Sequence, residues 1–329
     1  NTTGVGNVAV GALALCTHTT GDDNTALGLC ALISNTTSSD NVAVGSCSLD
    51  ANTTGDNNTA VGMLSLSTNT TADNNTAVGR GALKVNTTGT SNTAVGKSSL
   101  ENNTTADNNT GVGSFALCKN TEGFSNTAVG HCAIFTNTTG DKNTGVGVGA
   151  LLVSTTADNN TAVGYLSLAA NTTGHSNVAV GFNTLCSNTT GTQNTALGRT
   201  ALRSSTTSND NVAVGFAALY TNTTGCQNTA VGSCALDSSS SGNANTALGY
   251  NVLTSNTSGT SNVAVGALAL DANTTASNNT AVGYQSLSAN TTGANNIGVG
   301  SCSMLSNTTG ASNISIGKVA MCSNTEGAN

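Results

Sequence analysis

The chain has 329 residues, of which 7% are charged and 3% are aromatic, and it contains no proline and no tryptophan. Typical soluble domains carry roughly 25% charged residues, so the composition argues against an ordinary globular domain. The net charge of −7 comes without clustered lysines or arginines, and no apolar run approaches the roughly 20 residues of a membrane span, so we expect neither a nucleic-acid partner nor a membrane span.

One 17-residue repeat accounts for nearly the whole sequence. Repeats begin at an asparagine every 17 residues from Asn7 to Asn313, which gives 19 repeats without insertion or deletion. We therefore predict a partial repeat at 1–6 and a single repeat-array domain at 7–329. Because the chain starts inside a repeat and carries no atypical end repeat or leader, we expect it to be an excerpt of a longer array, since isolated solenoids usually need polar caps.

Numbered from its leading asparagine, the repeat reads N-[TV]-A-[VL]-G-x-x-[AS]-L-x-x-N-T-T-G-x-x. Positions 4 and 9 are always bulky and apolar, and positions 3 and 8 are nearly always small. Four such residues cannot form a core within one repeat. We therefore expect successive repeats to stack and to bury these positions in continuous rows.

The start of the repeat predicts one strand, because positions 1 to 5 are short and β-prone and end in glycine. The segment from position 6 to position 10 fits a second strand or a short helical turn. Together these features predict an all-β fold, a β-solenoid (β-roll) of 19 stacked repeats that spans about 90 Å. The position-1 asparagines predict a ladder of side-chain amides, whose first members are Asn7, Asn24, Asn41, Asn58, Asn75 and Asn92.

Nine of the ten cysteines fall at positions 7 and 10. Disulfides between adjacent repeats are one interpretation, which requires Cα atoms within about 7 Å and therefore a bent or helical segment. The alternative is that they are small apolar residues without bonds. The candidate pairs are Cys16 with Cys30, Cys118 with Cys132, and Cys302 with Cys322, whereas Cys30 with Cys47 competes, and partners for Cys47, Cys186, Cys226 and Cys234 stay open.

Position 12 is usually an asparagine followed by two threonines, which makes Asn-x-Thr or Asn-x-Ser acceptor sites. One interpretation is a row of N-glycans along the array. The other is turn chemistry, in which Asn and Thr side chains bond to nearby backbone. The candidates are Asn1, Asn35, Asn52, Asn69, Asn86, Asn103, Asn137, Asn171, Asn188, Asn222, Asn256, Asn273, Asn290 and Asn307. A sparser set at position 17 comprises Asn57, Asn74, Asn108, Asn159 and Asn278.

Residues suited to catalysis or metal binding are sparse. His18, His131 and His175 occupy three different repeat positions, so we expect surface residues that share no face. A row of aspartates at position 16 could hold calcium, but calcium loops usually supply several acidic residues per turn. Threonine rows at positions 2 and 13 could order water and bind ice, although position 2 is Val or Ile in seven repeats. We predict no enzymatic activity, no metal and no cofactor.

The run N-T-A-V-G, as at Asn58-Thr59-Ala60-Val61-Gly62, resembles the head repeats of trimeric autotransporter adhesins. It is also similar to repeat shafts of large surface and phage-fibre proteins. The resemblance implies a β-roll in an extracellular fibre at a cell or virion surface, with a homotrimer as one form of assembly and adhesion as the family role.

The sequence therefore predicts a structural component of an extracellular fibre or filament that self-associates end to end or laterally, with covalent N-glycans along one row of asparagines as one of the two interpretations of position 12. The alternative is an adhesin-type, ice-binding or glycan-binding module that presents a repetitive surface. Binding predicts a localised patch that breaks the repeat. Because positions 6, 7, 10 and 11 vary freely, the structural role is favoured.

Overall fold

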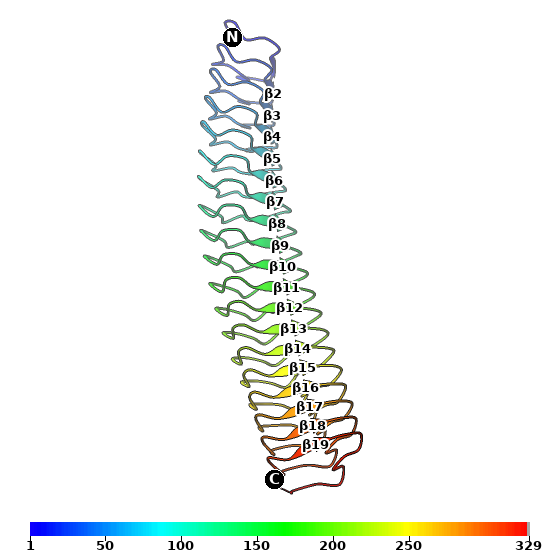
Figure 1. Cartoon of the computed structure of the whole chain (residues 1–329). Helices are drawn as coiled ribbons and strands as arrows, with labels where there is room; N and C mark the ends of the chain where they lie inside the picture. Colours follow the sequence, from blue (N-terminus) through cyan, green and yellow to red (C-terminus); the bar gives the residue numbers. More distant parts are fainter. Residues whose placement is uncertain (328–329) are drawn as a thin grey trace. The chain divides into compact units, whose positions relative to one another are not determined.

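The computed structural model describes residues 1–327 of two compact units, Asn1–Asn160 and Thr161–Asn329. Each unit is a β-solenoid in which every 17-residue repeat forms one coil with a single three-residue strand (Figure 1). The strands of the first unit are β1 (Val8–Val10), β2 (Thr25–Leu27), β3 (Val42–Val44), β4 (Thr59–Val61), β5 (Thr76–Val78), β6 (Thr93–Val95), β7 (Thr110–Val112), β8 (Thr127–Val129) and β9 (Thr144–Val146). Those of the second are β10 (Thr161–Val163), β11 (Val178–Val180), β12 (Thr195–Leu197), β13 (Val212–Val214), β14 (Thr229–Val231), β15 (Thr246–Leu248), β16 (Val263–Val265), β17 (Thr280–Val282), β18 (Ile297–Val299) and β19 (Ile314–Ile316).

Within each unit the strands form a parallel sheet in which every residue pairs with its equivalent one repeat later. In the first unit Ala43 pairs with Ala60, and in the second Ala213 pairs with Ala230. This register brings identical repeat positions together, so like side chains meet from coil to coil. The predicted solenoid and its one clear strand per repeat are confirmed.

The core of each coil differs from the predicted one at a single position. Side chains alternate along a strand, and position 3 points inward, so positions 2 and 4 both point outward. Ala43, Ser48 and Leu49, at positions 3, 8 and 9, are fully buried, whereas Leu27 at position 4 is 46% exposed. The expectation that position 4 lies in the core is therefore wrong. The interior is built from positions 3, 8 and 9 together with the buried polar residues at positions 1 and 12.

Small residues at position 3 make room for the large residue at position 9 of the preceding coil. Gly145 shows this directly, because a Cβ built there would lie 2.7 Å from Cγ1 of the buried Ile134. Packing of these two rows explains why position 3 is alanine or smaller in most coils.

Positions 6 to 11 form a turn, which is neither the second strand nor the helical turn that the sequence suggested. Residues at positions 7 and 9 have positive φ in coil after coil, as at Cys47 (φ 52°) and Leu49 (φ 49°). Left-handed conformations cost a residue such as leucine about 1–2 kcal/mol. Burial of the leucine side chain and backbone bonds to both neighbouring coils, such as Cys47 N–H to Leu29 O and Leu49 N–H to Ser65 O, offset that cost.

The position-5 glycines allow the coils to approach each other closely. Gly62 has a φ of 134°, a region that residues with a Cβ rarely adopt. A Cβ at this residue would lie 2.6 Å from the carbonyl oxygen of Gly79 in the next coil. Glycine is thus required both by the backbone conformation and by the stacking distance.

The predicted ladder at position 1 is present in both units. The backbone N–H of Asn58 donates to Oδ1 of Asn41 at 2.9 Å, and its Nδ2 donates to the carbonyl oxygen of Ala72 at 2.8 Å. Asn228 makes the same pair of bonds to Asn211 and Gly242 in the second unit. Among the predicted members, Asn7 accepts from the backbone N–H of Asn24, and each N–H of Asn41, Asn58, Asn75 and Asn92 likewise donates to Oδ1 of the asparagine one coil earlier.

Candidate functional site

The row of asparagines expected to carry glycans is a second buried ladder. Nδ2 of Asn86 donates to Oδ1 of Asn69 at 3.0 Å and to the carbonyl oxygen of Gly89 at 2.9 Å. An N-glycan is attached through this same nitrogen, so it would remove a donor and would have to occupy filled space. The structure thus contradicts glycosylation of the folded chain at the fully buried Asn35, Asn52, Asn69, Asn86, Asn103, Asn137, Asn171, Asn188, Asn222, Asn256, Asn273, Asn290 and Asn307, whereas Asn1 is exposed.

Two coils show that the ladder, and not the acceptor motif, determines the residue at position 12. Asn120 precedes Thr-Glu and has no acceptor motif, yet its Nδ2 donates to Oδ1 of Asn103 and to the carbonyl oxygen of Gly123. His18 replaces the asparagine in another coil, where it is buried and its Nε2 lies 2.8 Å from the carbonyl oxygen of Gly21. The expectation that His18 is a surface residue is therefore wrong.

The ladder breaks where serine occupies position 12, at Ser154, Ser205 and Ser239. Among the described residues, Oδ1 of Asn222 has no hydrogen-bond partner, and the same holds for Oγ of Ser239 in the next coil. Serine is too short to reach the amide of the neighbouring coil. The gap in the sequence pattern thus produces a gap in the bonding.

The remaining predicted site residues lie apart from one another. His131 is exposed and packs edge-on against Phe115, with ring centroids 6.3 Å apart, and His175 is exposed. The position-16 aspartates accept backbone bonds from the preceding coil, as Asp73 Oδ1 does from Asp56 N–H at 2.7 Å. Residues 1–327 contain no group of three or more His, Cys, Asp or Glu side chains arranged to hold a metal.

All ten cysteines are free thiols in the structure, so the pairs suggested by the sequence are not bonded there. Cys118 is buried, and burial together with the nearby Glu101 carboxylate raises the pKa of its thiol to about 11. Burial also raises the pKa of the Cys30 thiol, with a contribution from the neighbouring Cys47. The disulfide pairs Cys16–Cys30, Cys118–Cys132 and Cys302–Cys322 stay predictions.

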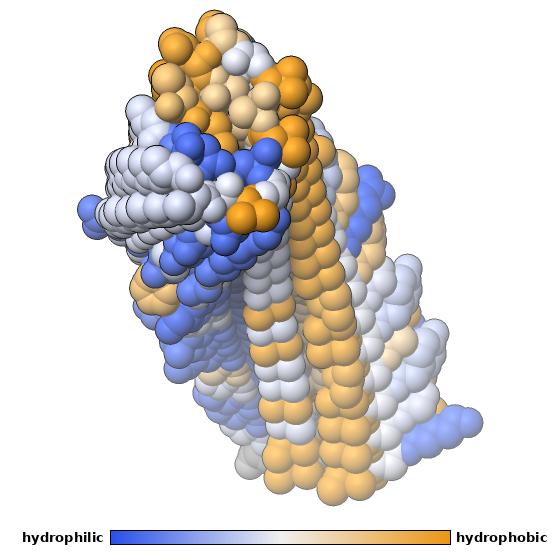
Figure 2. All heavy atoms as spheres, turned by 90° about the horizontal axis from the view of Figure 1, so that it is seen from above, coloured by the Kyte–Doolittle hydropathy of each residue, from blue (hydrophilic) through white to orange (hydrophobic). Residues whose placement is uncertain are grey.

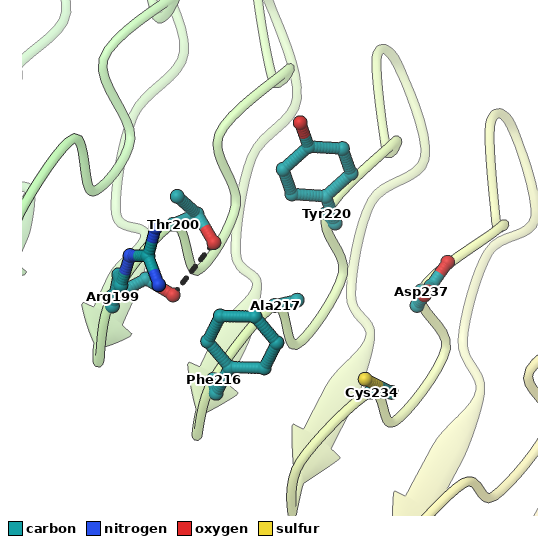
Figure 3. Close-up of a pocket in the computed structure, with 7 residues that line it drawn as sticks. All are labelled: Arg199, Thr200, Phe216, Ala217, Tyr220, Cys234 and Asp237. Carbon is teal, nitrogen blue, oxygen red and sulfur yellow. Dashed lines mark hydrogen bonds between the residues drawn. The ribbon is translucent and has the colours of Figure 1, made fainter.

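Most aromatic side chains and most of the basic ones lie on the turns formed by positions 6 to 11. Side chains at positions 6 and 10 border a groove, which we call the turn groove, and position 7 forms its floor. In the first unit a hollow of about 190 Å³ lies in this groove, lined by Leu64, Arg80, Gly81, Lys84, Ser98 and Glu101. In the second unit a hollow of about 340 Å³ is lined by Arg199, Thr200, Phe216, Ala217, Tyr220, Cys234 and Asp237 (Figure 3).

The two units fill the turn groove differently. In the first unit the Nζ of Lys97 lies 5.1 Å from the ring centroid of Phe115, a cation–π contact. In the second unit position 6 carries a series of exposed aromatic residues, which are Tyr165, Phe182, Phe216, Tyr250 and Tyr284. Sequence reasoning treated these positions as freely variable, although eight of the nine aromatic residues fall at positions 6, 7 and 10. This clustering of aromatic residues is the sequence feature that indicates the turn groove.

The sheet presents a second, more uniform surface. Position 2, mostly threonine, and position 4, always aliphatic, both face outward and form two rows in each unit. Figure 2 shows one uniformly hydrophobic row beside a row in which hydrophobic and less hydrophobic residues are mixed. The aliphatic residues at position 4, which the sequence pattern places in the core, therefore lie on the outer face of the sheet.

Comparisons of the sequence with known proteins identify no relative, so a proposal of function rests on the fold and the surfaces of the chain. The sequence matches no protein-family model and no curated protein sequence. A search of the described residues finds no helix with the length and hydropathy needed to cross a membrane.

Proposed function

We propose that the chain is a structural component of an extracellular fibre or filament. The observation that carries the proposal is that buried asparagine ladders at positions 1 and 12 bond successive coils within each unit, with the position-12 ladder interrupted at its serines, so the interior polar groups serve the stacking of coils. Amide ladders of this kind accompany stable stacked β-structures. The resemblance of N-T-A-V-G to adhesin and fibre repeats supports the same role.

Self-association, laterally or end to end and with a homotrimer as one form, belongs to this proposal. The aliphatic position-4 row supports lateral contact, because Leu197 and Leu248 are nearly half exposed on the sheet face of the second unit. Contiguous apolar surface of this kind is common at protein interfaces. The outward row offers each copy the same repeating contact.

Sedimentation and electron microscopy of the purified chain test the proposal. We expect the chain to assemble with rising concentration and oriented assemblies to diffract at about 4.8 Å along their axis, the strand spacing. The variant Leu197→Lys should weaken lateral assembly and leave the circular dichroism spectrum unchanged. A chain that stays monomeric at all concentrations would contradict the proposed self-association.

Binding of ice is a second candidate, which the outward sheet face favours. Aliphatic groups at position 4 repeat in every coil at about 4.8 Å, and threonine hydroxyls at position 2 lie beside them in 12 of the 19 coils. Thermal hysteresis of the purified chain tests it, and Thr229→Lys in the middle of the second unit should remove the effect. Freezing behaviour equal to that of serum albumin at the same concentration would reject this candidate.

A further inference from the structure

Arg199 in the second unit shows how the turn groove can hold a cation. Its guanidinium lies between two aromatic rings of the adjacent coils, with Cζ 5.9 Å from the centroid of Phe182 and 5.7 Å from that of Phe216. All three residues occupy position 6 of successive coils. The stack continues at the far side of Phe182, whose ring lies 5.4 Å from that of Tyr165.

The same aromatic spacing occurs twice more in this unit with a small residue in place of the arginine. In the first gap Ser233 lies between Phe216 and Tyr250, and in the second gap Ala267 lies between Tyr250 and Tyr284. The residues that flank each gap are two strand spacings apart along the sheet, about 9.6 Å. The three aromatic side chains are 47%, 58% and 51% exposed, so both gaps open to solvent.

Each gap also has a carboxylate at position 10 of its central coil. Asp237 belongs to the coil of Ser233, and Asp271 belongs to the coil of Ala267, whereas the coil of Arg199 has Arg203 there. Asp237 and Phe216 both line the 340 Å³ hollow of the turn groove (Figure 3). Asp271 is half-buried, and its Oδ1 is enclosed without a hydrogen-bond partner within residues 1–327.

We propose that the first gap and the second gap are binding sites for guanidinium groups, as carried by arginine side chains of a partner protein. A guanidinium is planar and weakly hydrated, so it can stack between two rings while its N–H groups donate to the carboxylate. A compact ammonium could not contact both rings equally well. This inference concerns binding and does not depend on the proposed structural role.

Two sites separated by two coils suit a partner with two arginines. The gaps lie about 9.6 Å apart, which a peptide in the polyproline II conformation spans in three residues with side chains i and i+3 on the same face. When one arginine is held, the second binds from a high effective concentration. A peptide with arginines at i and i+3 is therefore expected to bind at least tenfold more tightly than one arginine.

The test is an NMR titration of the full chain with N-acetyl-arginine amide and with the two-arginine peptide. We expect saturable shifts of the Tyr250 and Tyr284 ring signals, and no such shifts with N-acetyl-citrulline amide, which has the same shape without the charge. Tyr250 borders both gaps, so Tyr250→Ala should remove binding at both. Equal shifts with the citrulline amide would overturn the proposal.

Variants that fill the gaps from within separate binding from folding. Ser233→Arg and Ala267→Arg should each close one gap, as Arg199 closes its own, and the double variant should abolish the shifts while the fold is kept. The matched control is Ser46→Arg, at position 6 of the first unit between Leu29 and Met63, and it should leave binding unchanged. Full binding by the double variant would overturn the proposal, as would shifts caused by a neutral disaccharide and not by the arginine amide.

Discussion

The buried asparagine rows and the turn groove belong to the same coils but obey different constraints. Asn69 and Asn86 bond to the coils before and after them, so a change at either site affects more than one coil. At position 6 the side chains lie at the surface, and residues as different as Arg199, Phe216 and Ser233 are accommodated. Residues of the interior are therefore restricted by their bonds to neighbouring coils, whereas the side chains of the turn can vary and form a binding site.

Glycosylation gives the sharpest contrast, because acceptor motifs occur both in a buried row and in an exposed one. Asn86 at position 12 is buried, whereas Asn57 at position 17 is exposed. When the chain is secreted from a host that adds N-glycans, we expect the folded fraction to carry them only at position 17 and at the exposed Asn1. Glycans added at position 12 should prevent stacking and appear only in misfolded material. Glycopeptide mapping of the two fractions distinguishes these outcomes.

The variant Thr59→Val provides the matched control for that experiment. It removes the acceptor motif of Asn57 but keeps the strand, since valine occurs naturally at position 2, as in Val42. The glycan at Asn57 should disappear and the yield of folded protein should not change. A folded protein with a glycan on Asn86 would show that the buried ladder is wrong.

A methyl group at position 5 should have the largest effect of any single methyl addition on stability. Gly62→Ala places a Cβ 2.6 Å from the oxygen of Gly79 at a φ of 134°. We expect a loss of about 3 kcal/mol in the free energy of unfolding, measured in urea. Gly81→Ala is the matched control, because a Cβ at Gly81 would meet no atom nearer than 3.8 Å and position 7 carries larger residues at a similar φ, such as Leu64 (φ 60°). Equal losses for both variants would contradict the role of backbone conformation.

Completing the broken ladder should stabilise the second unit. In Ser239→Asn the new amide can donate to Oδ1 of Asn222, which lacks a partner within the described part of the chain. We expect a gain of about 1 kcal/mol in the free energy of unfolding. Ser238→Asn, one residue earlier, serves as the control and should give no gain. A loss of stability in Ser239→Asn would mean that the coil cannot accept the larger side chain.

The reactivity of the position-10 cysteines should follow their exposure. Cys118 is buried with its thiol pKa raised to about 11, whereas Cys16 is exposed at the same repeat position. Because the thiolate is the reactive form, we expect iodoacetamide at pH 8 to modify Cys118 at least tenfold more slowly than Cys16, a difference that urea should remove. Peptide mapping measures both rates. If mapping without reductant finds a Cys118–Cys132 bond, the sequence-based disulfide prediction is supported instead.

How much the sequence could predict depends on whether a position is determined by its own repeat or by its neighbours. The solenoid, its single strand and the Asn7-to-Asn92 ladder followed from the 17-residue period. The prediction that Val and Leu at position 4 are buried is wrong, because hydrophobicity alone does not tell which face of a three-residue strand is buried. The turn was missed because leucine rarely adopts positive φ, and burial of residues such as Leu49 overrides that preference.

The smallest predicted effect concerns Asp50, a position-10 carboxylate in the first unit. Burial raises its pKa above the ordinary 3.8, so the folded chain binds this proton more tightly than the unfolded chain does. Its contribution to stability is thus complete below pH 3.8 and is lost as the pH rises through the raised pKa. Asp50→Asn removes the ionisation, so its free energy of unfolding should match that of the parent chain at pH 3 and exceed it at pH 7. Ser67→Ala, at the same position, should show no such pH-dependent difference. If the advantage of Asp50→Asn were larger at pH 3, charge on Asp50 would have to favour folding, and the turn groove would be more solvated than its burial implies.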